Sequence, residues 1–178
     1  MAATFDWQSD HGAATGSPAK GTTRSTGRTD NNWKNTDDAA TVYSTSPIAA
    51  GNNSFDIWGF GKFTGTFNQI SSGLWAHTAG AMGTGLTIKG KVAPAGGYTT
   101  PSVSANANLS TDMTSVIAIG SGAAVQFGAT GPEAAGKAAS TTANPAYTEW
   151  LAHQLQTTGS ASPGDTATAT LTLRYDEN

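Results

Sequence analysis

The sequence predicts an all-β protein, a β-sandwich or jelly roll with an extended N-terminal arm. Three observations predict this class. Apolar and polar residues alternate in several short stretches, most regularly in the closing ATATLTLRY. Threonine is abundant, and its branched Cβ suits a pleated strand. The 22 glycines and 7 prolines divide the chain into short segments at turns.

The first element expected is an extended arm over residues 1–53, set apart from a sandwich domain over residues 54–178. The stretch SDHGAATGSPAKGTTRSTGRTDNNWKNTDD is almost free of aliphatic side chains, so it cannot bury enough apolar surface to fold alone. Aromatic residues are nevertheless spaced through or beside it. We therefore predict an arm that binds neighbouring subunits, with a disordered terminus as the alternative. Its expected contact residues are Trp7, Lys20, Arg24, Arg28, Trp33 and Tyr43.

The sandwich domain begins with SFDIWGFGKFTGTF, which predicts a strand pair or one long bent strand. Phe55 and Ile57 share one face of such a strand, and Trp58 and Phe60 share the other. Both faces are apolar, which fits a core or a face buried against another subunit. Trp58 and Phe60 are therefore added to the expected contact residues.

The middle of the domain predicts short strands between long loops. TGLTIKGKV alternates as a strand with one solvated side, MTSVIAIG is a continuous apolar run typical of a buried strand, and AAVQFG predicts another short strand. The intervening APAGGYTTPSVSANANLST and ATGPEAAGKAASTTANPA predict loops.

The last two elements are YTEWLAHQLQTT and the closing strand. The first of these also fits a helix, with Tyr147, Trp150, Leu151 and Leu155 on one face. A strand is favoured because the turn-like GSASPGD leads directly into a strand from Ala167. Seven or eight short strands of this kind favour a sandwich or jelly roll.

Composition and charge exclude several classes of protein. The chain has no cysteine, which excludes a disulfide framework, thiol catalysis and the common zinc modules. Only 12% of residues are charged and the net charge is −3, which indicates no nucleic-acid binding. We find neither a basic and apolar leader nor an apolar run of the ~20 residues that span a bilayer. We therefore expect synthesis in a cytoplasm and no membrane contact.

Catalytic and metal-binding patterns are weak. His11, His77 and His153 have no second ligand at metal-binding spacing, so each is expected to be structural. There is no GxSxG elbow for a serine nucleophile, and GAMGTG lacks the lysine of a phosphate loop. Asp56 and Glu149 could meet as a carboxylate pair, but nothing singles them out. We expect no enzyme, no metal and no cofactor.

Exposed tryptophans could instead stack on sugars. In a chain so poor in aliphatic residues, however, tryptophan is needed for the core and for interfaces. A carbohydrate-binding sandwich is therefore a minor alternative. Its candidates are Trp7, Trp33, Trp58, Trp75 and Trp150.

Two stretches carry a resemblance to a known family. FNQISSGLWAHTAGAMGTGLTIKG and the closing LQTTGSASPGDTATATLTLRYDEN resemble the small β-sandwich proteins of tailed-bacteriophage virions, and among these the capsid decoration, or cement, proteins. The resemblance covers residues 54–178. Similar endings are expected in tail proteins of the same virions.

The resemblance implies a non-enzymatic protein on the outer capsid surface. Such proteins are often trimeric, need no cofactor and stabilise the shell where major capsid subunits meet. The expected partners are therefore the major capsid protein and further copies of this chain, and the expected location is the virion. A tail-tube or fibre component is the alternative within the same particle.

Overall fold

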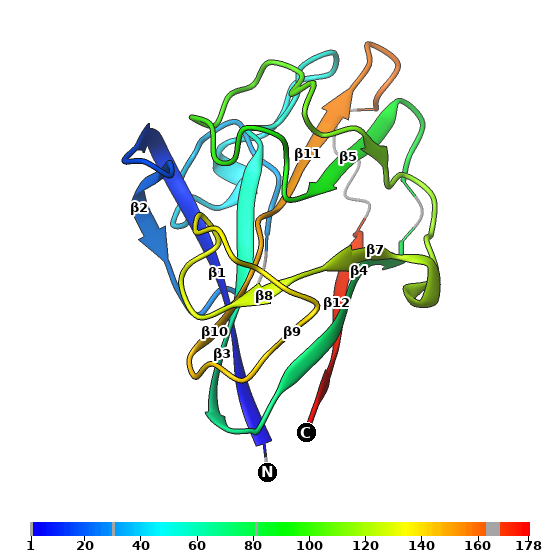
Figure 1. The fold of residues 1–178 in the computed structure, drawn as a ribbon. Coiled ribbons are helices and arrows are strands. Elements are labelled where there is room, and N and C mark those ends of the chain that lie inside the picture. Colours follow the sequence, from blue (N-terminus) through cyan, green and yellow to red (C-terminus); the bar gives the residue numbers. More distant parts are fainter. Residues whose placement is uncertain (1, 30, 81, 163–167) are drawn as a thin grey trace.

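The computed structural model describes residues 2–29, 31–80, 82–162 and 168–178. It is a β-sandwich built from two antiparallel sheets, so the predicted all-β class is confirmed (Figure 1). Helical structure in the described residues is limited to two 3₁₀ turns, η1 (Tyr43–Thr45) and η2 (Ile119–Ser121).

The larger sheet has eight strands. Its main path runs β2, β1, β3, β11, β5, β6, and β10 pairs with both β3 and β8. These strands are β1 (Ala2–Thr15), β2 (Lys20–Ser25), β3 (Ile57–Thr66), β5 (Leu86–Val92), β6 (Thr111–Asp112), β8 (Phe127–Gly128), β10 (Ala146–Thr148) and β11 (Leu151–Thr157).

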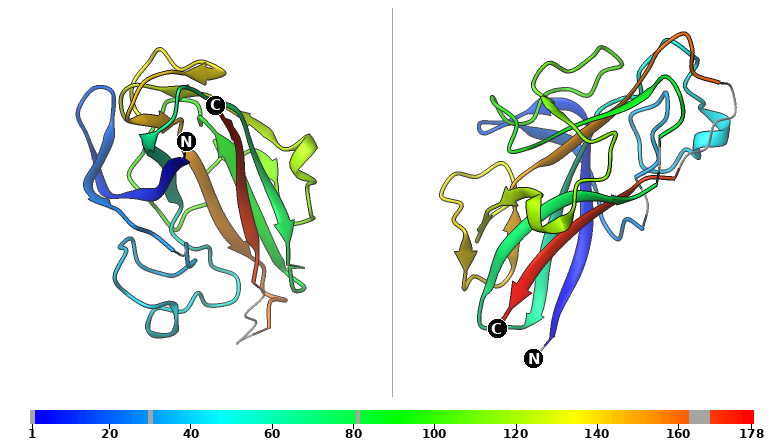
Figure 2. Two further views of the ribbon diagram at one scale, coloured as in Figure 1. Left: turned by 90° about the horizontal axis from the view of Figure 1, so that it is seen from below. Right: turned by 90° about the vertical axis from the view of Figure 1, so that its right-hand side faces the viewer.

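The smaller sheet has four strands and covers one face of the larger one (Figures 1 and 2). Its path is β12, β4, β7, with β9 pairing the start of β4. The strands are β4 (Ile70–Ala79), β7 (Ala123–Val125), β9 (Ser140–Thr141) and β12 (Thr170–Glu177). β12 therefore forms an edge of this sheet.

The expected arm is wrong for residues 2–25. β1 pairs with β3 in continuous register from Ala2↔Thr66 to Asp10↔Trp58, and β2 pairs with β1. The polar composition misled the prediction because β1 gains stability from backbone pairing and from two aromatic side chains. Phe5 lies 5.3 Å from Phe63, ring centre to ring centre. Within the described part of residues 1–53, only the segment after β2 lacks strands.

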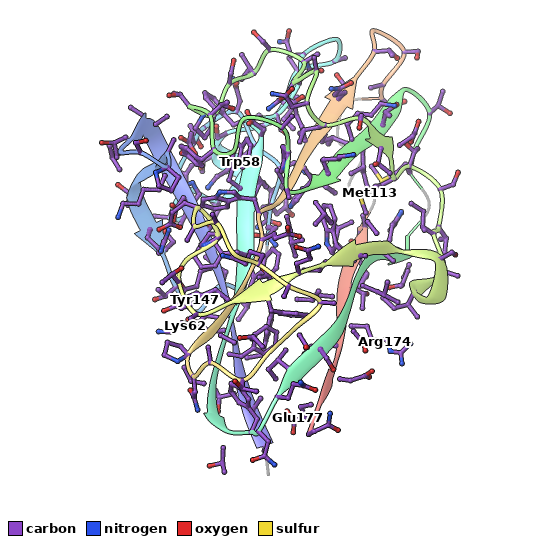
Figure 3. All side chains as sticks on the ribbon, viewed as in Figure 1. Trp58, Lys62, Met113, Tyr147, Arg174 and Glu177 are labelled. Atoms are coloured by element: carbon purple, nitrogen blue, oxygen red, sulfur yellow. The ribbon has the colours of Figure 1, made fainter. Side chains whose placement is uncertain are left out.

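Both faces of β3 are buried inside the molecule, which explains its doubly apolar sequence. Trp58 and Phe60 are 0% exposed and lie in a cluster with Tyr98, Leu109 and Trp150. Figure 3 labels Trp58 beside the upper part of β3, in the larger sheet. The opposite face carries Phe63, which packs on Ile70 and Phe127. The long loop between β5 and β6 supplies Tyr98 and Leu109, so a loop completes this part of the core.

The apolar run 113–120 is not the buried strand predicted for it. β6 ends before it, and Val116 is 59% exposed. The Met113 N–H donates to Ile88 of the larger sheet, whereas the Ile117 N–H donates to His77 of the smaller one. The run therefore crosses between the two sheets, which prevents it from pairing as a strand in either.

The other strand predictions are confirmed with small changes of boundary. Residues 147–158 form strands and not a helix, with β10 and β11 separated at Glu149 and Trp150. β5 lies within TGLTIKGKV, and AAVQFG is divided into β7 and β8. In the closing strand, Leu171, Leu173 and Tyr175 face the core as predicted, and Ala167 lies outside the described residues.

Candidate functional site

A serine, a histidine and an aspartate meet beside β1. Ser9 and His11 are two residues apart on one strand, so their side chains share a face. Ser9 Oγ lies 2.9 Å from His11 Nε2, and His11 Nδ1 lies 2.9 Å from Asp37 Oδ1. Asp37 Oδ2 accepts the Gly12 N–H at 2.6 Å. These atoms are connected in the order found in serine hydrolases.

This Ser9–His11–Asp37 cluster is closed to a substrate. Ser9 is 1% exposed, and the adjoining cavity of about 20 Å³ has room for about one water molecule. Thr36 Oγ1 is buried beside that cavity without a hydrogen-bond partner among the described residues. The cluster ties the segment after β2 to β1, and its role in this conformation is structural.

Two further carboxylates are buried and hydrogen-bonded within the protein. Asp10 accepts two hydrogen bonds from the Arg24 guanidinium, at 2.6 and 2.9 Å. Asp56 is 2% exposed, and burial raises its pKa. It accepts hydrogen bonds from Trp58 Nε1 at 2.6 Å and from the Ser102 N–H at 2.7 Å. Asp10 therefore joins β1 to β2, and Asp56 joins the long loop between β5 and β6 to β3, so these two acids are engaged in internal contacts.

Gln154 joins the same loop to β11. It is 0% exposed, and its Nε2 atom lies within 3.1 Å of the carbonyl oxygens of Ser54, Ser102 and Ser104. Its Oε1 atom accepts the Asn106 N–H at 3.2 Å. A buried amide with partners on both atoms holds the backbone of the long loop in one position.

The two remaining histidines are core residues. His153 is 0% exposed, its Nδ1 atom accepts a hydrogen bond from Trp33 Nε1 at 2.9 Å, and burial lowers its pKa to about 3. It is therefore neutral at pH 7. The ring nitrogens of His77 lie 2.7 and 2.6 Å from the carbonyl oxygens of Met113 and Ala79. The expectation that these histidines are structural agrees with both environments.

Most of the expected contact residues are used inside the molecule. Trp58 and Phe60 are core residues, which corrects their assignment to a subunit interface. Arg24 pairs with Asp10 and lies 4.6 Å above the Phe60 ring, so it is not a free cation for a partner.

The others are divided between internal contacts and the surface. Trp7 Nε1 donates to Asn31 Oδ1, and Trp33 Nε1 donates to His153. Arg28 donates to the Ala39 carbonyl. Lys20 and Tyr43 remain exposed, so these two keep the accessibility that the prediction requires.

An exposed apolar tip stands on the loop between β2 and β3. Val42 and Tyr43 are adjacent and are 55% and 50% exposed. Figure 2 shows their loop standing out from the two sheets. Lys34 Nζ donates to the Thr41 carbonyl, and the Asn35 N–H donates to the Ser46 carbonyl. The tip is therefore a preformed projection, and sequence analysis found Tyr43 but missed Val42.

Two cavities adjoin on another side of the molecule. They measure about 420 and 710 Å³ and share Ala93, Gln126 and Glu149 in their linings. Trp75 and Trp150 reach them but are each only 3% exposed, so neither presents a ring face on which a sugar could stack.

Lys137, which lines the larger cavity, is hydrogen-bonded within the protein. Lys137 Nζ donates to the carbonyl oxygens of Thr130, Gly131 and Ala134 at 2.8 to 3.2 Å. Burial lowers the pKa of Lys137.

Within the described ranges, no group of three or more His, Asp or Glu side chains could hold a metal ion. In that same part of the chain, no helix is long and apolar enough to span a bilayer.

Comparison with known proteins identifies no relative. No family model matches the chain, and no curated protein or solved structure matches it either.

Proposed function

We propose that the chain is a non-enzymatic structural protein of a bacteriophage virion, a capsid decoration protein that contacts and stabilises neighbouring major capsid subunits on the outer surface. The proposal combines the resemblance of residues 54–178 with the all-β fold. It requires a surface that binds another protein and needs no reactive site.

The observation that carries the proposal is the exposed tip at Val42 and Tyr43. Large apolar side chains that stand side by side on a projecting loop are typical of protein contact sites. The hydrogen bonds around Lys34 and Asn35 fix the loop before binding, which lowers the entropy lost on association. Tyrosine is also among the residues that most often dominate binding energy.

Three groups of the described residues that suggest chemistry are closed or engaged in internal hydrogen bonds. The Ser9–His11–Asp37 cluster is sealed, and the acids Asp10 and Asp56 are bound to loops and strands. The Val42 and Tyr43 side chains, by contrast, are half exposed.

Binding to expanded capsids of the encoding virus tests the proposal. Wild-type protein is expected to co-sediment with the shells and to raise the temperature at which they disrupt. Tyr43→Ala together with Val42→Asp should weaken binding by about tenfold or more, because the contact loses an aromatic anchor and gains a charge.

Val116→Asp is the matched control, since Val116 is equally exposed but lies on another loop. If wild-type protein does not bind capsids but co-purifies with separated tails, the decoration proposal is wrong and the tail alternative is supported. If the tip variant and the control bind capsids equally well, Val42 and Tyr43 are not part of the contact.

A further inference from the structure

The free edge of β12 is the feature that the proposed function does not use. β12 pairs with β4 along one side, and none of the described strands pairs with its other side. An unpaired edge presents backbone N–H and C=O groups to any strand that can approach. Figure 2 shows β12 beside β4, with the C-terminus next to the N-terminus.

The direction of these backbone groups follows from a neighbouring bond. The His77 carbonyl accepts the Ile117 N–H at 2.8 Å, so it points away from β12. His77 is the partner of Leu171. Because hydrogen-bonded and non-hydrogen-bonded pairs alternate in antiparallel strands, the N–H and C=O groups of Leu171 and Leu173 face the free edge.

We propose that β12 pairs antiparallel with β12 of a second copy of this chain, which joins the two smaller sheets into one continuous sheet across a two-fold axis. A two-fold contact must be complementary to itself. The order of charges in β12 meets this condition, since Arg174 precedes Asp176 by two residues.

The charges favour the register centred on Tyr175. With Tyr175 on the two-fold axis, Arg174 of each copy lies opposite Asp176 of the other. The register centred on Arg174 places the two arginines opposite each other, and like charges directly opposite are destabilising. The Arg174 and Asp176 side chains are 53% and 49% exposed, and their contact within one chain is a loose 3.7 Å. Figure 3 shows Arg174 at the periphery of the molecule.

Apolar surface beside this edge adds to the contact. Phe5 is 39% exposed and stacks on Tyr175 with ring centres 6.2 Å apart. Glu177 Oε2 accepts the Ala3 N–H at 2.9 Å, which holds the end of β12 against β1. Pairing at Tyr175 would cover the Phe5 and Tyr175 rings of both copies. Backbone hydrogen bonds, charge pairs and apolar contacts therefore all favour pairing at this edge.

Mass measurement of the full chain by analytical ultracentrifugation tests the proposal. Wild type should be a dimer at high concentration. Arg174→Asp and Asp176→Arg should each weaken the dimer by about tenfold, because both cross-strand pairs become repulsive. The double variant R174D/D176R should recover the dimer, and the two single variants should form a heterodimer when mixed.

Lys20→Asp is the matched control, since it reverses an exposed charge on β2, the edge of the other sheet, and should leave the dimer unchanged. Hydrogen exchange adds a direct readout. In this register Leu173 lies opposite Glu177 of the second copy, and Tyr175, which by the same alternation faces the free edge, lies opposite Tyr175. The Leu173 and Tyr175 amides should be protected in wild type at high concentration and unprotected in R174D, while near-UV circular dichroism shows that R174D is folded.

A monomer or trimer mass for wild type overturns the proposal, as does a double variant that fails to recover the dimer. The trimer implied by the virion resemblance is thus a separate outcome. A failed dimer test leaves the proposed capsid contact untouched, because Val42 and Tyr43 lie on the loop between β2 and β3 and not on β12. That contact is tested separately, by capsid binding.

Discussion

Individual polar residues decide which parts of this chain are rigid. His153 is the clearest case: it is 0% exposed, neutral and bound through Nδ1 to Trp33. Ser9 is another, because its hydroxyl contacts His11 in an arrangement that resembles a catalytic one but is closed to solvent. The same residue types that suggest catalysis in a sequence here form buried hydrogen bonds that hold segments of the fold together.

His153 should make stability sensitive to acid. Its pKa is about 3 in the folded protein and 6.5 in the ordinary state, so between these values the unfolded chain binds a proton that the folded chain does not. The free energy of unfolding should therefore fall as pH falls below 6.5, by up to about 1.4 kcal/mol per pH unit from this residue. His153→Asn can still accept from Trp33 but does not titrate. Urea unfolding should show a flatter pH dependence for this variant, and an unchanged slope would contradict the assignment.

Ser9 should be unreactive despite its histidine partner. A fluorophosphonate probe needs access to the hydroxyl, and Ser9 is 1% exposed. We expect wild type and Ser9→Ala to show the same background labelling in the native state, read by mass spectrometry of peptides. Native labelling at Ser9 that disappears in His11→Ala would show that the cluster opens and acts as a nucleophile.

At the scale of elements, β3 is the strand on which the others depend. It pairs with β1 on one side and with β10 and β11 on the other, and it buries both of its faces. Glycine allows the close approach of neighbouring side chains here, since a Cβ atom on Gly59 would overlap the Trp7 ring. The long loop after β5 depends in turn on β11 through Gln154.

Gly59→Ala should therefore destabilise the sandwich. The added methyl group forces Trp7 out of its place, at a cost of about 1–3 kcal/mol in the free energy of unfolding. Gly120→Ala is the control, because a Cβ atom there meets nothing within 4 Å. Urea unfolding of both variants checks the prediction, and equal stabilities would mean that Trp7 moves at no cost.

Gln154→Leu should release the long loop without unfolding the sheets. The substitution leaves the carbonyl groups of Ser102 and Ser104 without their buried donor, and we expect a loss of about 1–3 kcal/mol. Hydrogen exchange should rise over residues 98–109 and stay low in β3. The exposed Gln126→Leu serves as the control, and protection that persists in both variants would contradict the role of Gln154.

At the scale of the whole molecule, the N-terminal quarter is part of the sandwich. β1 provides nine register pairs to β3, from Ala2 to Asp10, and its polar end holds Asp37 of the following segment. The sandwich is completed by residues far apart in sequence, as in the bond from Ala3 to Glu177. We therefore expect binding to use side chains that the sandwich leaves exposed, such as Val42 and Tyr43.

Removing residues 1–40 should therefore unfold the protein. The deletion exposes one edge of β3 and strips Trp7 and Trp33 from the core around His153. We expect loss of the near-UV circular dichroism signal and of cooperative thermal unfolding. A truncated chain that keeps both signals would support the original prediction that residues 1–53 are an arm separate from the folded domain.

The sequence by itself determined the fold class and most strands, because alternation and turn residues are local signals. TGLTIKGKV and the strand that carries Leu171 and Leu173 were found in this way. Tertiary structure alone decided that residues 2–25 are strands, that Trp58 and Phe60 face inward, and that Ser9 meets Asp37. The physical reason is that a polar strand is stabilised by a partner distant in the chain, and no local pattern specifies that partner.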